Sequence, residues 1–422
     1  MMKKMFLIIL MSIALVFQTS CMKQDHQNPR ENQIDEIDVV DENDEQQQPE
    51  PSYEERIINS MDMDEKIGQL VIIGFSEGTP REALINAIKK DKIGGFILFR
   101  RNYDSFKSMY DLVSELKDLN KNNPLPLFIA VDEEGGTVSR IPKEGVTMPD
   151  AKKFGDINDL TLTEKSGSII GKQLYSAGIN MNFAPVLDIL SRDDNTLLKR
   201  RSYGKDVDRV SAHGISFIKG LTKEGIIPVP KHFPGHGHTK VDSHGGLPVI
   251  NIDRNTLDKR ELVPFRYTID KGLDAIMIGH LAFPQIDPSG KPATRSKIFV
   301  TDILKNELGF KGIAISDEIE MIGFTSGKDS IEDAVIESFN AGIDVFVIGH
   351  TAEIQQRVLK ALKNGVSTGL ITEERINEAL TRIVQVKRKY NLSDEMNVDF
   401  ETAYKLFADE EYKSFVEDIK RR

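Results

Sequence analysis

Apolar residues of this chain gather into eight short runs, each about as long as a β-strand. The runs are uninterrupted rather than alternating with polar residues. This pattern is typical of strands that are buried on both faces of a parallel sheet. The runs occupy residues 69–75, 93–99, 125–131, 179–186, 225–230, 274–278, 312–316 and 344–348.

Segments with helical periodicity separate these runs, among them 80–91, 103–121, 161–177, 207–223, 254–271 and 331–341. Repeated β/α units predict an α/β fold, a (β/α)8 TIM-like barrel. An open, doubly wound sheet is the alternative, but no glycine-rich phosphate fingerprint opens any of these helices. We expect one catalytic domain at 56–390, closed by an amphipathic helix at 371–390, and a short helical tail at 391–422.

The first 21 residues resemble a bacterial lipoprotein signal peptide. Lys3 and Lys4 precede an apolar segment, 5–17, that is short for a transmembrane helix. Small residues then lead to Cys21, although Gln18 stands where such signals usually have an aliphatic residue. We expect Cys21 to be lipidated and to anchor the protein to the outer face of the cell membrane. Ordinary secretion and an uncleaved anchor are the alternatives.

Residues 22–55 are rich in Gln, Asp, Glu, Asn and Pro and have few large apolar side chains. Twelve acidic and three basic residues between positions 22 and 56 give this stretch a net charge of −9. Such a segment cannot bury enough apolar surface to fold. We therefore expect an acidic, disordered tether that holds the folded domain away from the membrane.

The net charge and the cysteine count limit the partners and cross-links that the protein can have. The 422 residues carry a net charge of −11, which argues against a surface that binds nucleic acid. The single cysteine excludes an intramolecular disulfide. No sequence repeat indicates an assembly module, and we expect a monomer.

Charged or imidazole groups follow six of the eight apolar runs. In a (β/α)8 barrel the carboxyl ends of the strands form the active-site face. A regular supply of such groups at that place therefore predicts a site there. The groups are 132–134 after run three, Asp188 after run four, Lys231 and His232 after run five, His280 after run six, Asp317 and Glu318 after run seven, and His350 after run eight.

The stretch KHFPGHGHTKVDSH (231–244) holds four of the eight histidines of the chain. A zinc site is one interpretation, but the histidine spacing matches no compact zinc pattern and no cysteine is nearby. An acid/base site is the other, because Asp242 lies two residues before His244 and can fix its tautomer. We favour the acid/base site and expect no metal.

Four motifs together resemble the bacterial β-N-acetylglucosaminidases of glycoside hydrolase family 3. They are KHFPGHGHTKVDSH, GFKGIAISDEIEM (309–321), VDEEGGTVSR (131–140) and RRSYG (200–204). The resemblance extends over residues 56–390, and its most specific part is the Asp-Ser-His ending of the first motif. The sequence departs from the family pattern at Glu133, Thr137 and His238.

The resemblance implies roles for individual residues of the four motifs and for Asp188. Asp317 would be the nucleophile of a retaining glycosidase, although an aspartate there could also cap the following helix. His244 would be the general acid/base, oriented by Asp242. The residues that would bind the sugar are Asp132, Arg140, Asp188, Arg201, Lys231 and His232.

The resemblance therefore implies an exo-acting β-N-acetylglucosaminidase that needs no cofactor and cleaves cell-wall fragments (muropeptides). Phosphorolysis of the same substrates and β-glucosidase activity are the alternatives among enzymes. A lipoprotein that binds sugar or metal without catalysis is the alternative of another class.

Overall fold

The computed structural model describes residues 50–239, 245–327 and 329–422. Its centre is a parallel sheet of eight strands in the order β5-β4-β3-β2-β1-β8-β7-β6. Seven strands lie within the predicted apolar runs, and β7 extends two residues past the end of its run, so the predicted α/β barrel is confirmed. The strands are β1 (Val71–Ile73), β2 (Gly95–Ile97), β3 (Phe128–Val131), β4 (Met181–Asn182), β5 (Ile227–Pro228), β6 (Ala275–Ile278), β7 (Ile313–Glu318) and β8 (Val345–Ile348).

The two outer strands of this order, β5 and β6, are joined by the chain that follows β5. Phe233 forms a parallel bridge with Ile278. The N–H of Phe233 donates to the carbonyl of Met277, and the N–H of Met277 donates to the carbonyl of Pro230. The start of the histidine stretch therefore completes the barrel wall.

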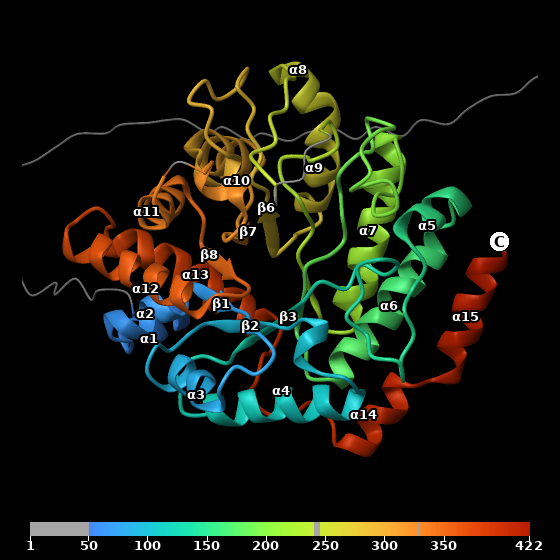
Figure 1. Ribbon diagram of the computed structural model, residues 1–422, viewed down its shortest axis with the longest axis horizontal. Helices are drawn as coiled ribbons and strands as arrows, with labels where there is room; N and C mark the ends of the chain where they lie inside the picture. Colours follow the sequence, from blue (N-terminus) through green and yellow to red (C-terminus); the bar gives the residue numbers. More distant parts are fainter. Residues whose placement is uncertain (1–49, 240–244, 328) are drawn as a thin grey trace, which may run out of the picture. The chain divides into compact units, whose positions relative to one another are not determined.

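Helices surround the strands (Figure 1), and polar caps start many of them. Ser105, Asp159, Asp206 and Ser330 each accept a hydrogen bond from a backbone N–H of the first helical turn. The α-helices that alternate with the first seven strands are α3 (Arg81–Lys89), α4 (Phe106–Asn120), α5 (Ala151–Ile157), α6 (Leu160–Ser176), α7 (Val207–Lys223), α8 (Arg254–Thr256), α9 (Val263–Ile269), α10 (Ile322–Thr325) and α11 (Ile331–Ala341). Short helices of other types are η1 (Arg100–Asn102), η2 (Leu257–Glu261), η3 (Ala293–Arg295) and η4 (Ile298–Glu307).

The segment 254–271, predicted as one regular helix, contains a π-helical turn, η2, between α8 and α9. The N–H of Leu262 bonds to the carbonyl of Leu257, five residues back. A periodicity of 3.6 residues does not reveal such a turn. The turn carries Glu261, which lies against Gly235 of the histidine stretch.

The ends of the folded region are helical. Helix α1 (Tyr53–Asn59) begins before the predicted domain boundary at residue 56, and α2 (Met63–Gly68) follows it. After β8 come α12 (Ala352–Ser367) and α13 (Glu373–Lys389), the predicted closing helix. Cys21 and residues 22–49 of the predicted tether lie outside the described residues. None of the described helices is long and apolar enough to cross a membrane.

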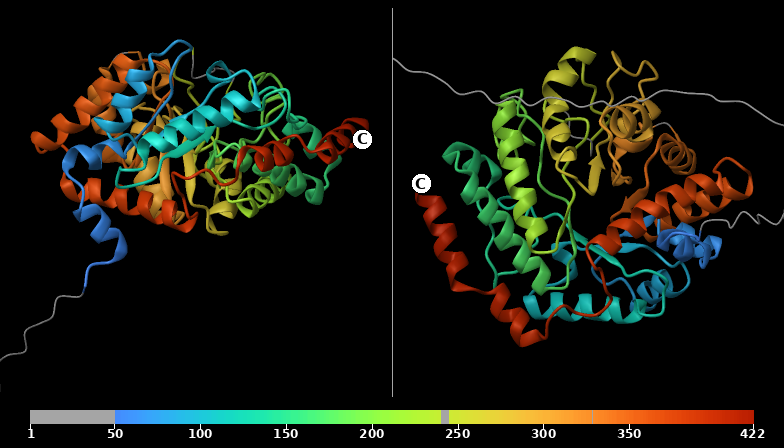
Figure 2. Two further views of the ribbon diagram at one scale, coloured as in Figure 1. Left: turned by 90° about the horizontal axis from the view of Figure 1, so that it is seen from below. Right: turned by 180° about the vertical axis from the view of Figure 1, so that it is seen from behind.

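The predicted helical tail forms α14 (Phe400–Phe407) and α15 (Glu410–Arg421). The Phe407 ring stacks on Phe106 of α4, with 4.2 Å between the ring centroids. Figure 2 shows this tail continuing along the helical layer of the barrel. The tail therefore belongs to the same hydrophobic core as the barrel.

Candidate active site

A cavity of about 250 Å³ lies at the carboxyl ends of the barrel strands. Six residues predicted to form the site line it: Asp132, Arg140, Arg201, Lys231, His232 and Asp317. Five of them follow β3, β4 or β5, and Asp317 is the last residue but one of β7. The barrel therefore brings together groups that are up to 185 positions apart in the sequence, the separation of 132 and 317.

A buried network of charges forms one wall of this cavity. Lys231, which is 3% exposed, places its Nζ 2.6 Å from Asp132 Oδ1 and 2.7 Å from Glu134 Oε1. Arg201 donates through Nε and Nη2 to both Glu134 oxygens, each at 2.7 Å. Burial alone would raise the pKa of Glu134, but Arg201 and Lys231 hold it far below its usual value. The wall therefore presents fixed charges, which suits the binding of sugar hydroxyls.

Asp188, one of the residues that the resemblance assigns to sugar binding, supports two histidines of the cavity wall. It does not line the cavity but lies behind His232, fully buried. Its Oδ2 is 2.6 Å from His232 Nδ1, and its Oδ1 accepts the backbone N–H of His236 at 2.7 Å. Burial would raise the pKa of Asp188, but His232 and His236 hold it below the usual value. Asp188 is thus positioned to hold His232 rather than to touch a ligand.

Arg140 reaches the cavity from the loop after β3. Its Nη2 lies 3.8 Å from Asp132 Oδ2. The buried carboxylate of Glu133 accepts the backbone N–H groups of Arg140 and Ile141. The second Glu133 oxygen has no hydrogen-bond partner within the described part of the chain, and burial raises the pKa of this group to about 7.

Asp317 lies at a bulge near the end of β7. Ile315 pairs with Val345 and Glu318 with Val347, so three steps along β7 match two steps along β8. Such bulges redirect side chains next to active sites. Both Asp317 and Glu318 consequently line the cavity. The next helix, α10, has Met321 as its N-cap, so Asp317 does not cap it.

The two neighbouring carboxyl groups differ in their pKa. Burial would raise the pKa of Asp317, but His232, His280, the Glu318 N–H and Lys231 hold it below its usual value. Burial, together with the charges of Glu320 and Asp317, raises the pKa of Glu318 to about 7. When the environments of two neighbouring carboxyl groups push their pKa values apart, the group with the lower pKa is the one that stays ionised. That group is Asp317.

Among the residues that the structure describes, one group has ligand atoms close enough together to hold a metal ion: Glu318, Glu320 and His350. However, Arg101 Nη2 lies 2.8 Å from His350 Nδ1. Because arginine can only donate, Nδ1 accepts and the neutral ring carries its proton on Nε2. Nε2 is the atom 3.3 Å from Glu318, so this arrangement favours a hydrogen bond there over a metal.

The sequence also raised expectations for His280 and for the acid/base pair of His244 and Asp242. The ring of His280 contacts Thr294 Oγ1 and the carbonyl of Glu318, and this residue does not line the cavity. His244 and Asp242 lie outside the described residues. Two residues that line the site, Glu134 and His236, had no individual role assigned from the sequence. The acidic run at 132–134 and the histidine-rich stretch were the signals for them.

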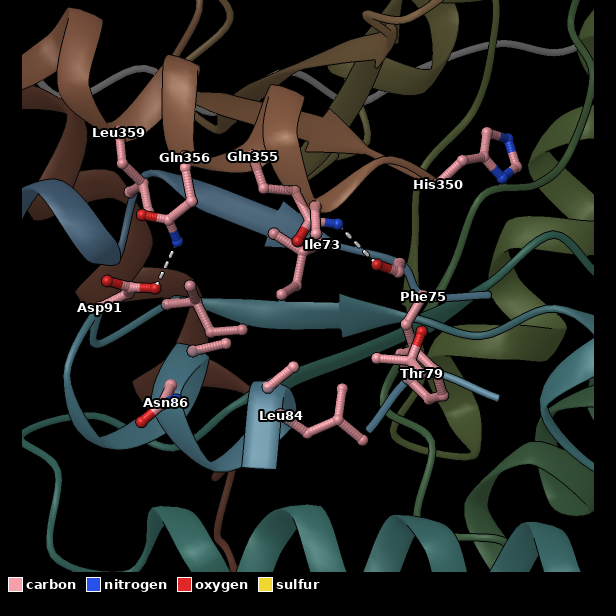
Figure 3. A pocket seen from close by; sticks show the side chains of 15 residues that line it. Ile73, Phe75, Thr79, Leu84, Asn86, Asp91, His350, Gln355, Gln356 and Leu359 are labelled. Atoms are coloured by element: carbon pink, nitrogen blue, oxygen red, sulfur yellow. Dashed lines mark hydrogen bonds between the residues drawn. The ribbon is translucent and has the colours of Figure 1, made fainter. Parts of the chain in front are cut away.

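A second cavity, of about 260 Å³, lies between α3, α12 and the end of β1 (Figure 3). Most of its lining is apolar, and two glutamines of α12 cross it. Gln355 donates to the carbonyl of Gly74, and Gln356 donates to Asp91. His350 lines both cavities, but its ring is directed away from the other labelled side chains in Figure 3. The charged groups of the candidate site are therefore confined to the first cavity.

Comparisons with known proteins agree with this geometry. The model of the glycosyl hydrolase family 3 N-terminal domain matches residues 62–386. The chain belongs to glycosyl hydrolase family 3. The match includes the whole barrel, from β1 to β8, and most of α13.

Three relatives illustrate the similarity within family 3. The beta-hexosaminidase A of Pseudoalteromonas piscicida is 34% identical over 336 residues, which are 72% of this chain and 55% of the relative. The beta-hexosaminidase of Neisseria gonorrhoeae is 35% identical over 263 residues, 61% of this chain and 71% of the relative. A solved family 3 beta-N-acetylglucosaminidase from a Paenibacillus species superimposes with a TM-score of 0.79 at 33% identity, covering 85% of this chain and 68% of that one. The chain thus spans only about half the length of the first relative.

Proposed function

We propose that this protein is a retaining exo-β-N-acetylglucosaminidase. The observation that carries the proposal is an aspartate held ionised, Asp317, that faces a cavity walled by the Lys231, Asp132 and Glu134 charges. Relatives named beta-hexosaminidase and the similar beta-N-acetylglucosaminidase structure support the choice of sugar. The cavity, at about 250 Å³, lies below the roughly 300–1,000 Å³ of pockets for drug-sized ligands. A single terminal sugar suits it better than an internal stretch of a polysaccharide.

The proposed reaction has two displacements at the anomeric carbon. A carboxylate oxygen of Asp317 attacks this carbon, and the bond from the carbon to the leaving oxygen breaks. The leaving oxygen takes a proton from the imidazolium of His244. Water then attacks the same carbon, neutral His244 takes a proton from it, and the bond to Asp317 breaks. In this proposal Asp242 orients His244.

The charged wall would hold the sugar through both steps. Asp132 and Arg140 offer an acceptor and a donor at the cavity surface, and Lys231 lies between Asp132 and Glu134. Asp188 would fix His232 with Nδ1 turned away from the sugar, which leaves Nε2 for a hydroxyl. Each contact would fix the anomeric carbon relative to Asp317.

The test is turnover of two nitrophenyl glycosides by the purified protein. We expect release of nitrophenol from the β-N-acetylglucosaminide, and the β-anomer of the sugar as the first product seen by NMR. Turnover of the β-glucoside alone would contradict the proposed sugar specificity. The α-anomer as first product would contradict the retaining mechanism.

We further propose that Cys21 carries a lipid anchor and that the natural substrates are cell-wall fragments. Labelling of the expressed chain with a fatty-acid analogue should depend on Cys21 and should be lost in Cys21→Ser. Release of N-acetylglucosamine from muropeptides tests the substrate. Equal labelling of Cys21→Ser, or no release from any fragment, would contradict these proposals.

A further inference from the structure

His236 is a buried histidine of the cavity wall whose ring forms no hydrogen bond with any residue that the structure describes. It is 3% exposed and lines the same cavity as Asp317. Neither of its ring nitrogens has a hydrogen-bond partner among the described residues. Leaving a buried polar group unpaired is unfavourable, so such a group in a native protein requires an explanation.

The backbone of His236 is firmly held, so the unpaired ring does not reflect a loosely placed residue. The His236 N–H donates to Asp188 Oδ1 at 2.7 Å. The Asn195 amide lies 3.5 Å from the His236 carbonyl and 3.4 Å from the Gly237 carbonyl. Asp188 also holds His232, so the two imidazoles share one support. Their ring centroids are 5.8 Å apart.

The ring of His236 is suited to a neutral, polar ligand. Burial lowers its pKa, and the neighbouring His232 lowers it further against the opposing effect of Asp188. A neutral imidazole offers one N–H donor and one nitrogen acceptor. Sugar hydroxyls and an acetamido group match this pair of functions.

We propose that His236 is a further substrate-contacting residue, whose neutral imidazole forms a hydrogen bond with a polar substituent of the bound sugar. The inference rests on the proposed function of the cavity as a sugar site. Unpaired polar atoms of this kind give specificity, because a ligand without the matching group leaves them unsatisfied. The substituent is a ring hydroxyl or the acetamido group, and substrates that differ at this position separate the two.

A matched control exists in the same chain. His213 of α7 is also buried, but its ring has two partners, Thr163 Oγ1 at 2.8 Å and Asn158 Oδ1 at 3.3 Å. It does not line the cavity. Replacing each histidine by phenylalanine therefore separates a polar group kept for a ligand from one used to hold the fold.

The experiment measures thermal unfolding, with and without N-acetylglucosamine, and the kcat and KM of the full chain. His236→Phe should unfold at a temperature no lower than the parent, because it removes unpaired atoms. It should lose roughly ten- to a hundredfold in kcat/KM and much of the sugar-induced shift in Tm. His213→Phe should show the reverse, a lower Tm with unchanged kcat/KM.

Two more variants identify the nitrogen and the substituent. His236→Asn places an amide near the position of Nδ1 and His236→Gln near that of Nε2, so the one that restores activity identifies the bonding nitrogen. If His236→Phe lowers kcat/KM on the N-acetylglucosaminide but not on the glucoside, the bonded substituent is the acetamido group. If His236→Phe lowers kcat/KM equally on both glycosides, the bonded substituent is a ring hydroxyl.

Three results would overturn the inference: parental kcat/KM and sugar-induced shift in His236→Phe, a fall in Tm like that of His213→Phe, or failure of His236→Phe to fold. A parent inactive on both glycosides contradicts the proposed enzymatic function instead. The sugar-induced shift in Tm still tests the contact in that case.

Discussion

Two buried clusters of charge lie at opposite ends of the barrel and are built from similar side chains. At the amino end of β8, the fully buried Asp344 binds Lys305, Arg375 and Arg382 and accepts the backbone N–H of Ala314. At the carboxyl end, Asp132 and Glu134 bind Lys231 and Arg201. The first cluster lies outside the candidate site, with Asp344 itself fully buried, whereas the second lines the cavity of the site.

This difference shows how to separate stability from function in a barrel. Asp344 ties β8 to α13 and η4, so its ion pairs join elements of the fold. Near the cavity, Glu133 Oε1 and both ring nitrogens of His236 lack hydrogen-bond partners among the described residues, which is unfavourable for the free protein. In the Asp344 cluster one guanidinium nitrogen of Arg375 also lacks a hydrogen-bond partner there. Charges at the amino ends of barrel strands are therefore expected to hold the fold, and those at the carboxyl ends to bind a ligand.

The largest effect should follow from Asp317→Asn. The amide keeps the shape of the side chain but cannot act as an anionic nucleophile, so we expect turnover to fall by about 10⁴-fold or more. Unfolding should change less than in a variant that breaks an ion cluster, because the amide oxygen can still accept the Glu318 N–H that Asp317 Oδ1 accepts. Steady-state rates and thermal unfolding measured together test this. A variant that retains a tenth of the parental rate would contradict the role of Asp317.

Asp344→Asn is the matched change at the other end of the barrel. Removing one member of a buried ion cluster leaves the cations uncompensated, so we expect the free energy of unfolding to fall by about 3–5 kcal/mol. The kcat/KM of the folded fraction should not change, because the cluster does not face the cavity. Denaturant unfolding beside rates at low temperature provides the measurement. A specific loss of kcat/KM would remove the distinction between the two ends.

The two ends should also respond to pH in opposite directions. The pKa of Glu133 is raised from 4.5 to about 7, so its contribution to stability is complete below pH 4.5 and lost as pH rises through 7. The pKa of Asp344 is held below 3.8, against the effect of burial, by Lys305, Arg375 and Arg382. The contribution of Asp344 to stability is present above pH 3.8. It is lost as the pH falls through the lower pKa that this group has in the folded protein.

Glu133→Gln therefore has the smallest expected effect, a change of pH dependence. It should remove a decline in stability between pH 4.5 and 7 that amounts to at most about 3 kcal/mol. Unfolding free energies across this range, compared between parent and variant, give the answer. Parallel curves would show that the pKa of Glu133 is the same in the folded and the unfolded protein, which contradicts the prediction.

The sequence predicted the strands and the cavity position because both depend on local patterns. Continuous apolar runs identified the eight strands, and acidic or imidazole groups directly after them identified the site face. The position of Asp188 behind His232 was not predictable, because a strand-end carboxylate can face the cavity or the protein. The ion pairs of Glu134 were also not predictable, since they connect residues 67 and 97 positions apart (134 to 201 and 134 to 231).

The π-helical turn and the unpaired ring of His236 depend on three-dimensional packing. The turn at 257–261 places Glu261 against Gly235, where an added Cβ would come within 2.8 Å of the Glu261 side chain. Only glycine fits this contact, and the backbone there has a φ of +129°, which also favours glycine. The sequence motif contains this glycine, but the contact that requires it can be seen only in the folded structure.

The most direct test of the account is to trap the intermediate. A fluorinated N-acetylglucosaminyl fluoride that forms the glycosyl-enzyme faster than water removes it should add one sugar to the protein. We expect intact mass spectrometry to show a single adduct, peptide mapping to place it on Asp317, and Asp317→Asn to show none. An adduct on another residue, or continued turnover with no adduct on Asp317, would contradict the covalent mechanism.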